Sequence, residues 1–185
     1  MGSAQNRMIW LAVIVAVIVS DQLTKWLILS NPDFNAIPCL DPVVPCGRIQ
    51  ISSVFDLTML WNRGISFGTL QSDGIMRWVL VLVTAGIAGG FTYWLFRAER
   101  WLTCLSLALV VGGAIGNLVD RVRFGAVVDF LDFSGPWFGA TIAGWPVGFP
   151  WVFNIADAGI TVGAVLLFLD QFLMSRSKAG EATGA

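Results

Sequence analysis

The most informative feature of this sequence is how little charge and how few reactive side chains it contains. Only 12% of its 185 residues are charged, whereas an average soluble domain carries about 25%. The chain has no histidine and three cysteines. The missing histidine excludes Ser-His-Asp and Cys-His nucleophile systems and any His-ligated zinc or haem. Three cysteines are too few for a four-cysteine zinc or iron–sulfur site, so we expect no metal and no cofactor.

The few charges present are mostly carboxylates. The chain contains ten aspartates and two glutamates, its only lysines are Lys25 and Lys178, and its net charge is −1. Because it offers no basic stripe that could follow phosphates, we expect no nucleic-acid partner. Any acid–base chemistry on this chain would therefore depend mainly on aspartates.

Hydrophobic residues make up 56% of the chain, and four apolar stretches are long enough to cross a membrane, which takes about 20 residues. They cover approximately residues 8–29, 75–96, 101–119 and 152–174. The sequence thus predicts an all-α membrane protein with four transmembrane helices. We expect one membrane-embedded domain over residues 1–185.

The positions of basic residues predict how these helices are oriented. Four spans place both termini on the same side, and cytoplasmic flanks carry an excess of Lys and Arg. Arg97 and Arg100 lie in the short turn between the second and third spans, and Arg176 follows the fourth. We therefore expect cytoplasmic termini and two long periplasmic segments, at 30–74 and 120–151.

The two outer segments have compositions that predict some structure of their own. Residues 49–61 are rich in β-branched and aromatic side chains, which predicts one or two short strands. The second segment combines Trp137, Trp145 and Trp151 with proline and glycine. That combination is typical of an irregular loop at the level of the lipid headgroups. The expected architecture is a four-helix bundle with a small β-rich periplasmic cap.

Small residues recur at fixed spacing within the predicted helices. Pairs with G-x-x-x-G spacing occur at residues 86–90, 112–116 and 159–163. This spacing allows membrane helices to approach closely, so it predicts helix packing and carries no functional weight.

The cysteines admit two interpretations. Cys39 and Cys46 lie seven residues apart in the first outer segment, and in an oxidising compartment a structural disulfide is the favoured one. A redox-active pair is the alternative. Cys104 lies in the third span and is expected to be a small buried residue.

Ionisable residues within the spans are costly to bury and therefore suggest function. Asp21 and Lys25 lie one helical turn apart in the first span, where a neutralising pair is the favoured interpretation. Asn117, Asp120 and Arg121 recur at helical spacing at the outer end of the third span. An interfacial ion pair between Asp120 and Arg121 would be the structural explanation there.

Two further aspartates combine apolar neighbours with a position near the outer membrane surface. Asp129 lies in the run AVVDFL, where desolvation would raise its pKa as a general acid requires. Asp157 lies just inside the outer end of the fourth span, with Asn154 expected on the same helical face. If the two carboxylates meet, they would share a proton and could hydrolyse a peptide bond by activating water and protonating the carbonyl. The spacing alone leaves open whether they meet.

Five blocks of this sequence resemble those of the lipoprotein signal peptidase (signal peptidase II) family. In that family's order, they are DQLTK from Asp21, NRGISF from Asn62, GGAIGNLVDR from Gly112, VVDF from Val127 and FNIAD from Phe153. The resemblance implies a bacterial inner-membrane aspartyl endopeptidase. Such an enzyme removes the signal peptide from diacylglyceryl-modified prolipoproteins by cutting before the lipidated cysteine. Its partners would be that substrate and membrane lipid, and we expect a monomer.

The resemblance also implies roles for individual residues. Asp129 and Asp157 match the family's catalytic pair. The positions that line or shape the substrate site are matched by Asn62, Gly64, Asn117, Arg121 and Asn154, and the supporting polar positions by Asp21, Lys25 and Asp120. Residues 31–48 belong to none of the five blocks, and no role carries over to them.

Two other classes of function are compatible with some of these residues. A four-span thiol oxidoreductase could use Cys39 and Cys46, but such relays usually need a second exchanging pair, and only Cys104 remains. A small proton-coupled transporter could use the buried aspartates, but the sequence shows no matching repeats or broken helices. We rank the transporter last.

Overall fold

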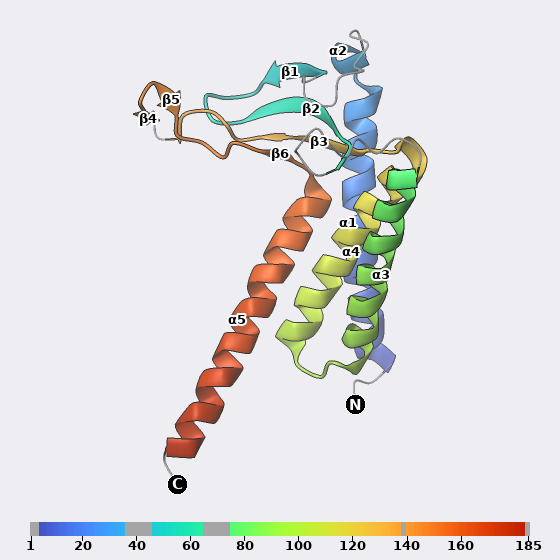
Figure 1. Cartoon of the computed structure of the whole chain (residues 1–185), viewed down its shortest axis with the longest axis vertical. Helices are drawn as coiled ribbons and strands as arrows, with labels where there is room; N and C mark the ends of the chain where they lie inside the picture. Colours follow the sequence, from blue (N-terminus) through green and yellow to red (C-terminus); the bar gives the residue numbers. More distant parts are fainter. Residues whose placement is uncertain (1–3, 36–45, 65–74, 138–139, 184–185) are drawn as a thin grey trace.

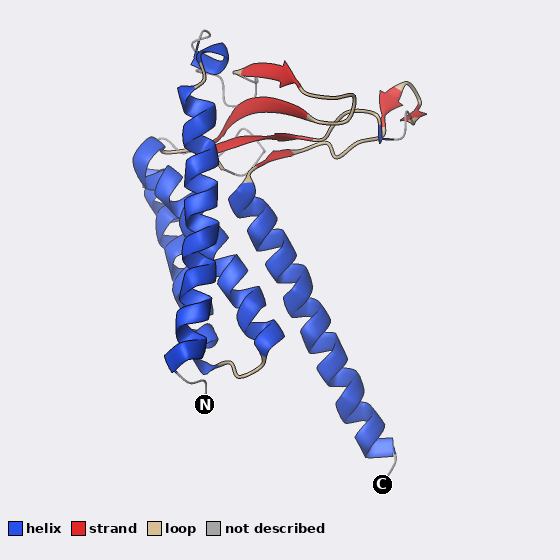
Figure 2. Ribbon diagram, turned by 180° about the vertical axis from the view of Figure 1, so that it is seen from behind, coloured by secondary structure: helices blue, strands red, loops and turns tan. Residues whose placement is uncertain are grey.

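Four long helices lead away from a small sheet that covers one end of the bundle (Figures 1 and 2). The computed structural model describes residues 4–35, 46–64, 75–137 and 140–183. The long helices are α1 (Ala4–Ser30), α3 (Ile75–Arg97), α4 (Trp101–Phe124) and α5 (Ile155–Thr183), and a short helix, α2 (Pro32–Asn35), follows α1. Each long helix contains a stretch long and apolar enough to cross a membrane. The predicted class of four transmembrane helices with a small β cap is confirmed.

The third span is longer than the apolar pattern predicts. The expected end is residue 119, but α4 continues to Phe124 and ends before Gly125, whose φ of 77° is left-handed. The Arg77 side chain stabilises this end, because its Nε donates to the carbonyl of Arg121 at 2.9 Å and its Nη2 donates to the carbonyl of Val122. The polar last turn of α4 therefore remains helical.

The fourth span, in contrast, begins later than expected. Val152 and Phe153 form the short strand β6, and α5 starts at Ile155. Asn154 ends the strand and caps the helix, since its Oδ1 accepts the N–H of Asp157 at 2.9 Å. The expectation that Asn154 and Asp157 share a helical face is therefore wrong. Asn154 lies at the junction between the sheet and α5.

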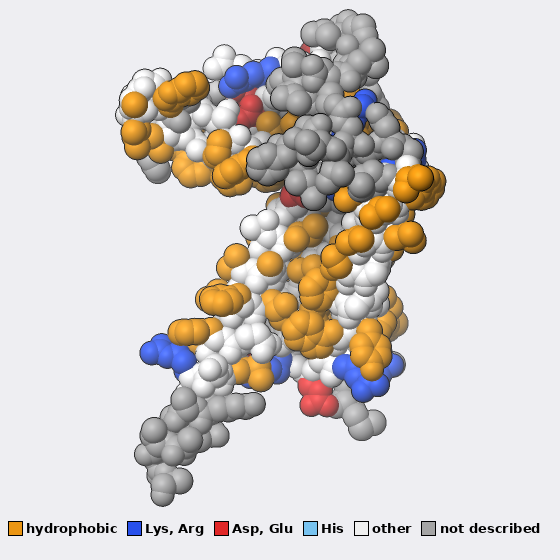
Figure 3. Space-filling model, in the orientation of Figure 1, with side chains coloured by type: hydrophobic (Ala, Val, Ile, Leu, Met, Phe, Trp, Pro, Cys, Tyr) orange, Lys and Arg blue, Asp and Glu red, His pale blue; other side chains and the backbone are white. Residues whose placement is uncertain are grey.

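Helix α4 occupies the centre of the bundle and packs against α1, α3 and α5. Its Leu107 and Val111 are buried beside Ile14 of α1 and Leu95 of α3, and Cys104 is buried as predicted. Large apolar side chains cover the outward faces of the helices (Figure 3). Such faces suit a lipid environment, in which outward apolar groups need no burial within the protein.

The cap is a four-stranded antiparallel sheet in the order β1-β2-β3-β6. Strands β1 (Gly47–Gln50) and β2 (Asp56–Asn62) confirm the strands predicted in the first outer segment. Strand β3 (Val127–Asp132) was not predicted, because its nearly continuous apolar run lacks the alternation of a half-exposed strand. One face of the sheet packs against the end of α1 and against Phe34 of α2.

The second outer segment also contains a small hairpin in place of the predicted irregular loop. Strands β4 (Thr141–Ile142) and β5 (Trp145–Pro146) pair at the tip of an arm that projects sideways from the sheet (Figure 1). Trp145 and Trp151 are exposed, and their place at the level of the headgroups stays a prediction.

Of the two cysteines of the predicted disulfide, one lies among the described residues. Cys46 is buried and disulfide-bonded, and Cys104 is free. Cys39, the expected partner of Cys46, lies outside the described residues.

The glycine pairs on α4 and α5 lie at close helix contacts, whereas the pair on α3 does not. A Cβ at Gly113, beside the 112–116 pair, would overlap the carbonyl oxygen of Ala156, and one at Gly163 would lie 2.6 Å from the carbonyl oxygen of Ser106. At Gly86 and Gly90, no described atom lies within 4 Å of such a Cβ. Glycine therefore brings α4 and α5 together.

The substitution Gly113→Ala should destabilise the contact between α4 and the first turn of α5. Overpacking of this kind costs about 1–3 kcal/mol, because the obstructing atom belongs to the backbone of Ala156. We expect a lower midpoint of thermal unfolding in detergent. The matched control is Gly89→Ala on α3, where the added methyl group meets no described atom within 4 Å. Equal midpoints for the two variants would contradict the packing argument.

Candidate active site

Asp129 is a buried carboxylate in the middle of β3, with only 1% of its surface exposed. Its two oxygens accept hydrogen bonds from two asparagine amides. Asn154 Nδ2 donates to Oδ1 at 2.6 Å, and Asn62 Nδ2 donates to Oδ2 at 3.0 Å. Asn62 ends β2 and pairs with Val127 of β3, so it lies diagonally across the two strands from Asp129. The carboxylate is thus held in one orientation from both sides.

Asp157 lies in the first turn of α5 and is held in a similar way. Asn117 Nδ2 of α4 donates to its Oδ1 at 2.7 Å, and the backbone N–H of Asn154 donates to its Oδ2 at 3.3 Å. Since the Asn154 side chain also bonds Asp129, a single residue touches both carboxylates. The two aspartates that the sequence singled out are therefore linked through Asn154.

The surroundings of Asp129 favour its protonated form. Burial, reinforced by the charge of Asp157, raises the pKa of Asp129 to about 7, although hydrogen bonds from Asn62 and Asn154 act in the opposite direction. This upward shift of the pKa agrees with the expectation from the apolar neighbours of Asp129 in the sequence. Two carboxylates so placed can hold one proton between them near neutral pH.

Beneath the two aspartates lies a fully buried charged cluster centred on Lys25. Its Nζ lies 2.8 Å from Asp21 Oδ2 and 2.8 Å from Asp120 Oδ2, and it donates to Asn117 Oδ1 at 3.1 Å. The predicted pair between Asp21 and Lys25 is confirmed. The suggested pair between Asp120 and Arg121 is wrong, because the extension of α4 turns Asp120 inward to Lys25.

The carboxylates of this cluster also hold the backbone beside each of the two site aspartates. Asp21 Oδ1 accepts the N–H of Ala156 at 3.0 Å, one residue before Asp157. Asp120 Oδ2 accepts the N–H of Val128 at 3.1 Å, one residue before Asp129. The cluster therefore sets the position of α5 and of β3 relative to α1 and α4.

Gln22 belongs to this cluster and was missed by the sequence analysis. Its Nε2 donates to Asp120 Oδ1 at 2.9 Å, to Asp21 Oδ2 at 3.1 Å and to the carbonyl of Gly116 at 3.2 Å. The signal that could have found it is its place beside Asp21 within an apolar span, where an amide needs partners.

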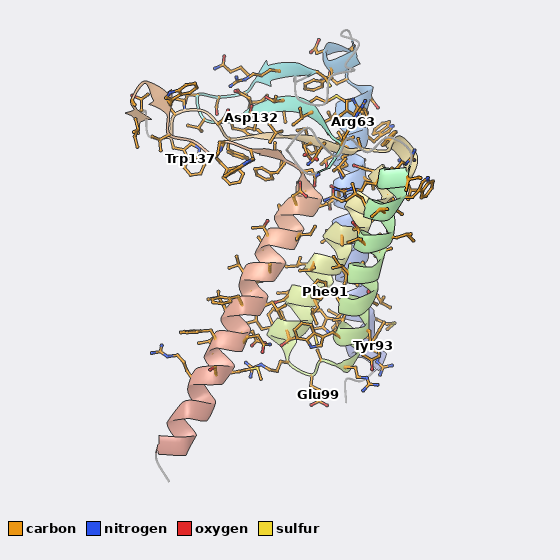
Figure 4. The ribbon with its side chains drawn as sticks, viewed as in Figure 1. Arg63, Phe91, Tyr93, Glu99, Asp132 and Trp137 are labelled. Carbon is orange, nitrogen blue, oxygen red and sulfur yellow. The ribbon has the colours of Figure 1, made fainter. Side chains whose placement is uncertain are left out.

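Gly64 and Arg121 lie at the edge of the site. Gly64 has a φ of 133°, which favours glycine, and its N–H donates to Asn62 Oδ1 at 3.1 Å. The amide nitrogen of Asn62 is thereby directed to Asp129. Arg121 Nη1 lies 3.4 Å from the carbonyl oxygen of Asn117, and the charges of Asp157 and Asp129 act on its guanidinium. Arg63 follows β2 at the same end of the sheet (Figure 4).

The described part of the chain contains no group of three or more Cys, Asp or Glu side chains placed to hold a metal ion. The chemistry available at the site is that of a carboxylate pair held by amides. It is the arrangement that an aspartyl hydrolase requires.

Comparison with known proteins gives one consistent result. A family model described as signal peptidase (SPase) II matches residues 13–173. The chain belongs to the signal peptidase II family. It is 38% identical over 184 residues to a lipoprotein signal peptidase of Caulobacter vibrioides, covering 96% of both chains. It is 40% identical to one of Burkholderia mallei, covering 88% of this chain and 86% of that one.

The fold of a solved structure is similar as well. A bacterial membrane enzyme determined by the in meso method matches with a TM-score of 0.69 at 25% identity, covering 91% of this chain and 90% of the other. The match includes nearly the whole chain, cap and helices together. This signal peptidase II family member is thus a multi-pass bacterial membrane protein.

Replacing Lys25 by methionine should strongly destabilise the protein. The substitution leaves Asp21 and Asp120 buried without their cation, and breaking a buried ion pair typically costs about 3–5 kcal/mol. We expect a large loss of thermal stability in detergent. Arg176→Met removes an exposed charge at the far end of α5 and serves as the control. Unchanged stability of Lys25→Met would show that the cluster does not hold the fold.

The proton of Asp129 should be observable as a carboxyl group that titrates near pH 7. Infrared difference spectra of the wild type and of Asp129→Asn would identify its band. In Asp157→Asn the nearby negative charge is absent, so the pKa of Asp129 should fall and its band should disappear at a lower pH. An unshifted titration would mean that the two carboxylates do not interact.

Proposed function

We propose that this chain is a membrane aspartyl endopeptidase that removes the signal peptide from prolipoproteins, with Asp129 and Asp157 as its catalytic pair. The observation that carries the proposal is the pair of carboxylates joined through Asn154. Membership of the signal peptidase II family supports the activity, and the relatives are named lipoprotein signal peptidases. As the family resemblance implies, cleavage falls before the cysteine that carries diacylglycerol.

The two carboxyl groups, one ionised and one protonated, can carry out the proton transfers that hydrolysis of a peptide bond requires. Asp157 as carboxylate takes a proton from water while the water oxygen attacks the scissile carbonyl carbon, and protonated Asp129 gives its proton to the carbonyl oxygen. In the second step the tetrahedral intermediate collapses. Asp129 then recovers its proton from the hydroxyl group, and Asp157 protonates the departing nitrogen. Asn62 and Asn154 hold Asp129 through these steps, and Asn117 holds Asp157.

The site lies at the end of the bundle that the sheet covers, and both chain ends point to the other end (Figure 1). Figure 3 shows basic side chains at both ends of the molecule, and those at the end opposite the sheet include Arg97, Arg100 and Arg176, which flank the membrane spans. By the positive-inside rule we place the termini in the cytoplasm and the site on the periplasmic side of the inner membrane. An apolar signal helix would approach it from the bilayer. A single chain supplies every proposed site residue, which supports a monomeric enzyme.

The alternative of a thiol oxidoreductase finds no support. The family and its relatives are peptidases, and the free cysteine, Cys104, is buried in α4. We assign Cys46 a structural role in the cap, where it packs beside Phe34 and Met59.

Replacing either catalytic aspartate by asparagine should abolish cleavage while leaving the protein folded. The change removes the ionisable group but keeps the side-chain shape, and loss of an acid or base function typically costs a factor of about 10²–10⁴. Cleavage of a lipidated prolipoprotein by purified Asp129→Asn and Asp157→Asn would be followed by gel mobility. Asp33→Asn, which alters an exposed aspartate of α2, is the matched control and should retain full activity. Retained cleavage in either active-site variant would refute its assignment.

The rate of cleavage should fall as the pH rises above about 7. Asp129 loses its proton around that pH, and without it no group protonates the carbonyl oxygen. We expect kcat to decline about tenfold per pH unit on this limb, as for a single ionisation. A rate that stays constant up to pH 9, measured with a substrate whose own groups do not titrate, would contradict the role of Asp129 as the acid.

A further inference from the structure

A second concave site lies on the cap, away from the catalytic pair. It is a cleft of about 480 Å³ between strands β1 and β2 and the arm that follows β3, and its walls include Arg48, Gln50, Asp56, Pro136, Trp145 and Pro150. Figure 4 shows Asp132 and Trp137 in this projecting part of the cap. Nothing in the proposed mechanism uses this cleft.

The sheet register places the cleft on the face opposite Asp129. Gln50 pairs with Asp56 and Asp56 pairs with Asp132, so these side chains share a face. Asp129 precedes Asp132 by three residues, and strand side chains alternate, so its carboxylate points to the other face. The cleft therefore lies on the face of the sheet opposite Asp129, the face to which Val128 and Phe130 also belong.

The cleft contains a buried acceptor that lacks a donor. Arg48 Nε donates to Asp56 Oδ2 at 2.8 Å, and Arg48 Nη2 also contacts that oxygen. Among the described residues, Asp56 Oδ1 is the buried side-chain atom without a hydrogen-bond partner. An unsatisfied buried acceptor is costly. The Arg48 side chain, in contrast, is 55% exposed, and its charge is available to a second acceptor.

The neighbouring carboxylate does not compete for such a ligand. Asp132 accepts hydrogen bonds from the Thr58 hydroxyl at 2.6 Å and from the N–H of Ser134 at 2.9 Å. Burial acts to raise the pKa of Asp132, but these bonds and the charge of Arg48 outweigh it and lower the pKa. Asp132 is thus an ionised carboxylate whose hydrogen bonds are made within the cap, next to Ser134 of the cleft wall.

These groups together define the chemistry of a ligand. It must offer an N–H or O–H donor to Asp56 and an acceptor to Arg48, and it must present surface to a tryptophan that is 77% exposed and to two prolines. A polypeptide backbone supplies one donor and one acceptor at every residue. Among the described strands, β1 also lies at an edge of the sheet, and edge strands carry backbone groups that can pair with an extended peptide.

We propose that this cleft binds the mature region of the prolipoprotein, the residues that follow the cleavage site, as an extended peptide. The proposal rests on the proposed function. β2 connects the two sites, because Asn62 at one end bonds Asp129 and Asp56 at the other end lines the cleft. Six residue steps of a strand span about 20 Å. A substrate must therefore extend at least about six residues past the cleavage site to reach the cleft.

The test compares two lipidated substrates that share the signal peptide and cleavage site. One ends about three residues after that site and the other about fifteen, lengths chosen on either side of the strand distance. For the wild type we expect a lower KM for the long substrate. The double variant Gln50→Ala with Trp145→Ala should raise that KM about tenfold, as loss of an exposed aromatic anchor can. Its kcat and its KM for the short substrate should stay the same as in the wild type.

A control and a binding experiment make the outcomes distinct. Trp151→Ala alters another exposed tryptophan of the same segment, one that is not among the described residues lining the cleft, and its effect should not depend on substrate length. We expect a fluorescent peptide of the mature region alone to bind the single variant Asp129→Asn. It should bind the double variant, Asp129→Asn with Trp145→Ala, more weakly.

Equal KM for both substrates in the wild type would overturn the proposal. An equal change for both substrates in the cleft variant would also overturn it and indicate a lipid contact. If neither substrate is cleaved by the wild type, the proposed function fails instead.

Discussion

The ammonium group of Lys25 is buried between two carboxylates, and this ion-pair cluster holds the helices and the sheet in place. It joins Asp21 of α1 to Asp120 of α4, and each of those carboxylates accepts a backbone N–H from the element that carries one aspartate of the proposed catalytic pair. One cation thus sets the relative position of α1, α4, α5 and β3. In a bilayer no water can replace these partners, so the cluster must be satisfied internally.

Asn154 converts this framework into a reactive site. It stands where the sheet ends and α5 begins, and it caps the helix through Asp157 while its amide reaches Asp129. The capping interaction that starts the helix therefore also places the two carboxylates beside each other. Because the same groups serve folding and chemistry, the geometry of the pair is preorganised before any substrate arrives.

The cap separates two kinds of environment. On one face of the sheet, burial and the neighbouring charge of Asp157 raise the pKa of Asp129 to about 7. On the other face, Asp132 and Asp56 lie among polar groups, and hydrogen bonds hold Asp132 ionised. Asp129 and Asp132 of the same strand thus differ in protonation because strand alternation turns them to opposite faces.

The membrane class, the number of spans, the strands of the first outer segment and the two aspartates proposed as the catalytic pair could all be predicted from the sequence. Hydropathy and motif order are local properties, and each of these features is encoded in consecutive residues. The tertiary structure alone decided which polar groups meet. Proximity in sequence suggested an ion pair between Asp120 and Arg121, but Asp120 pairs with Lys25. Asn154 was expected to lie within the last helix, but it caps that helix instead. For Gln22, the sequence offered no indication of a role except its position next to Asp21. Contacts between residues about a hundred positions apart, such as Gln22 with Asp120, follow from helix packing, which one sequence does not specify.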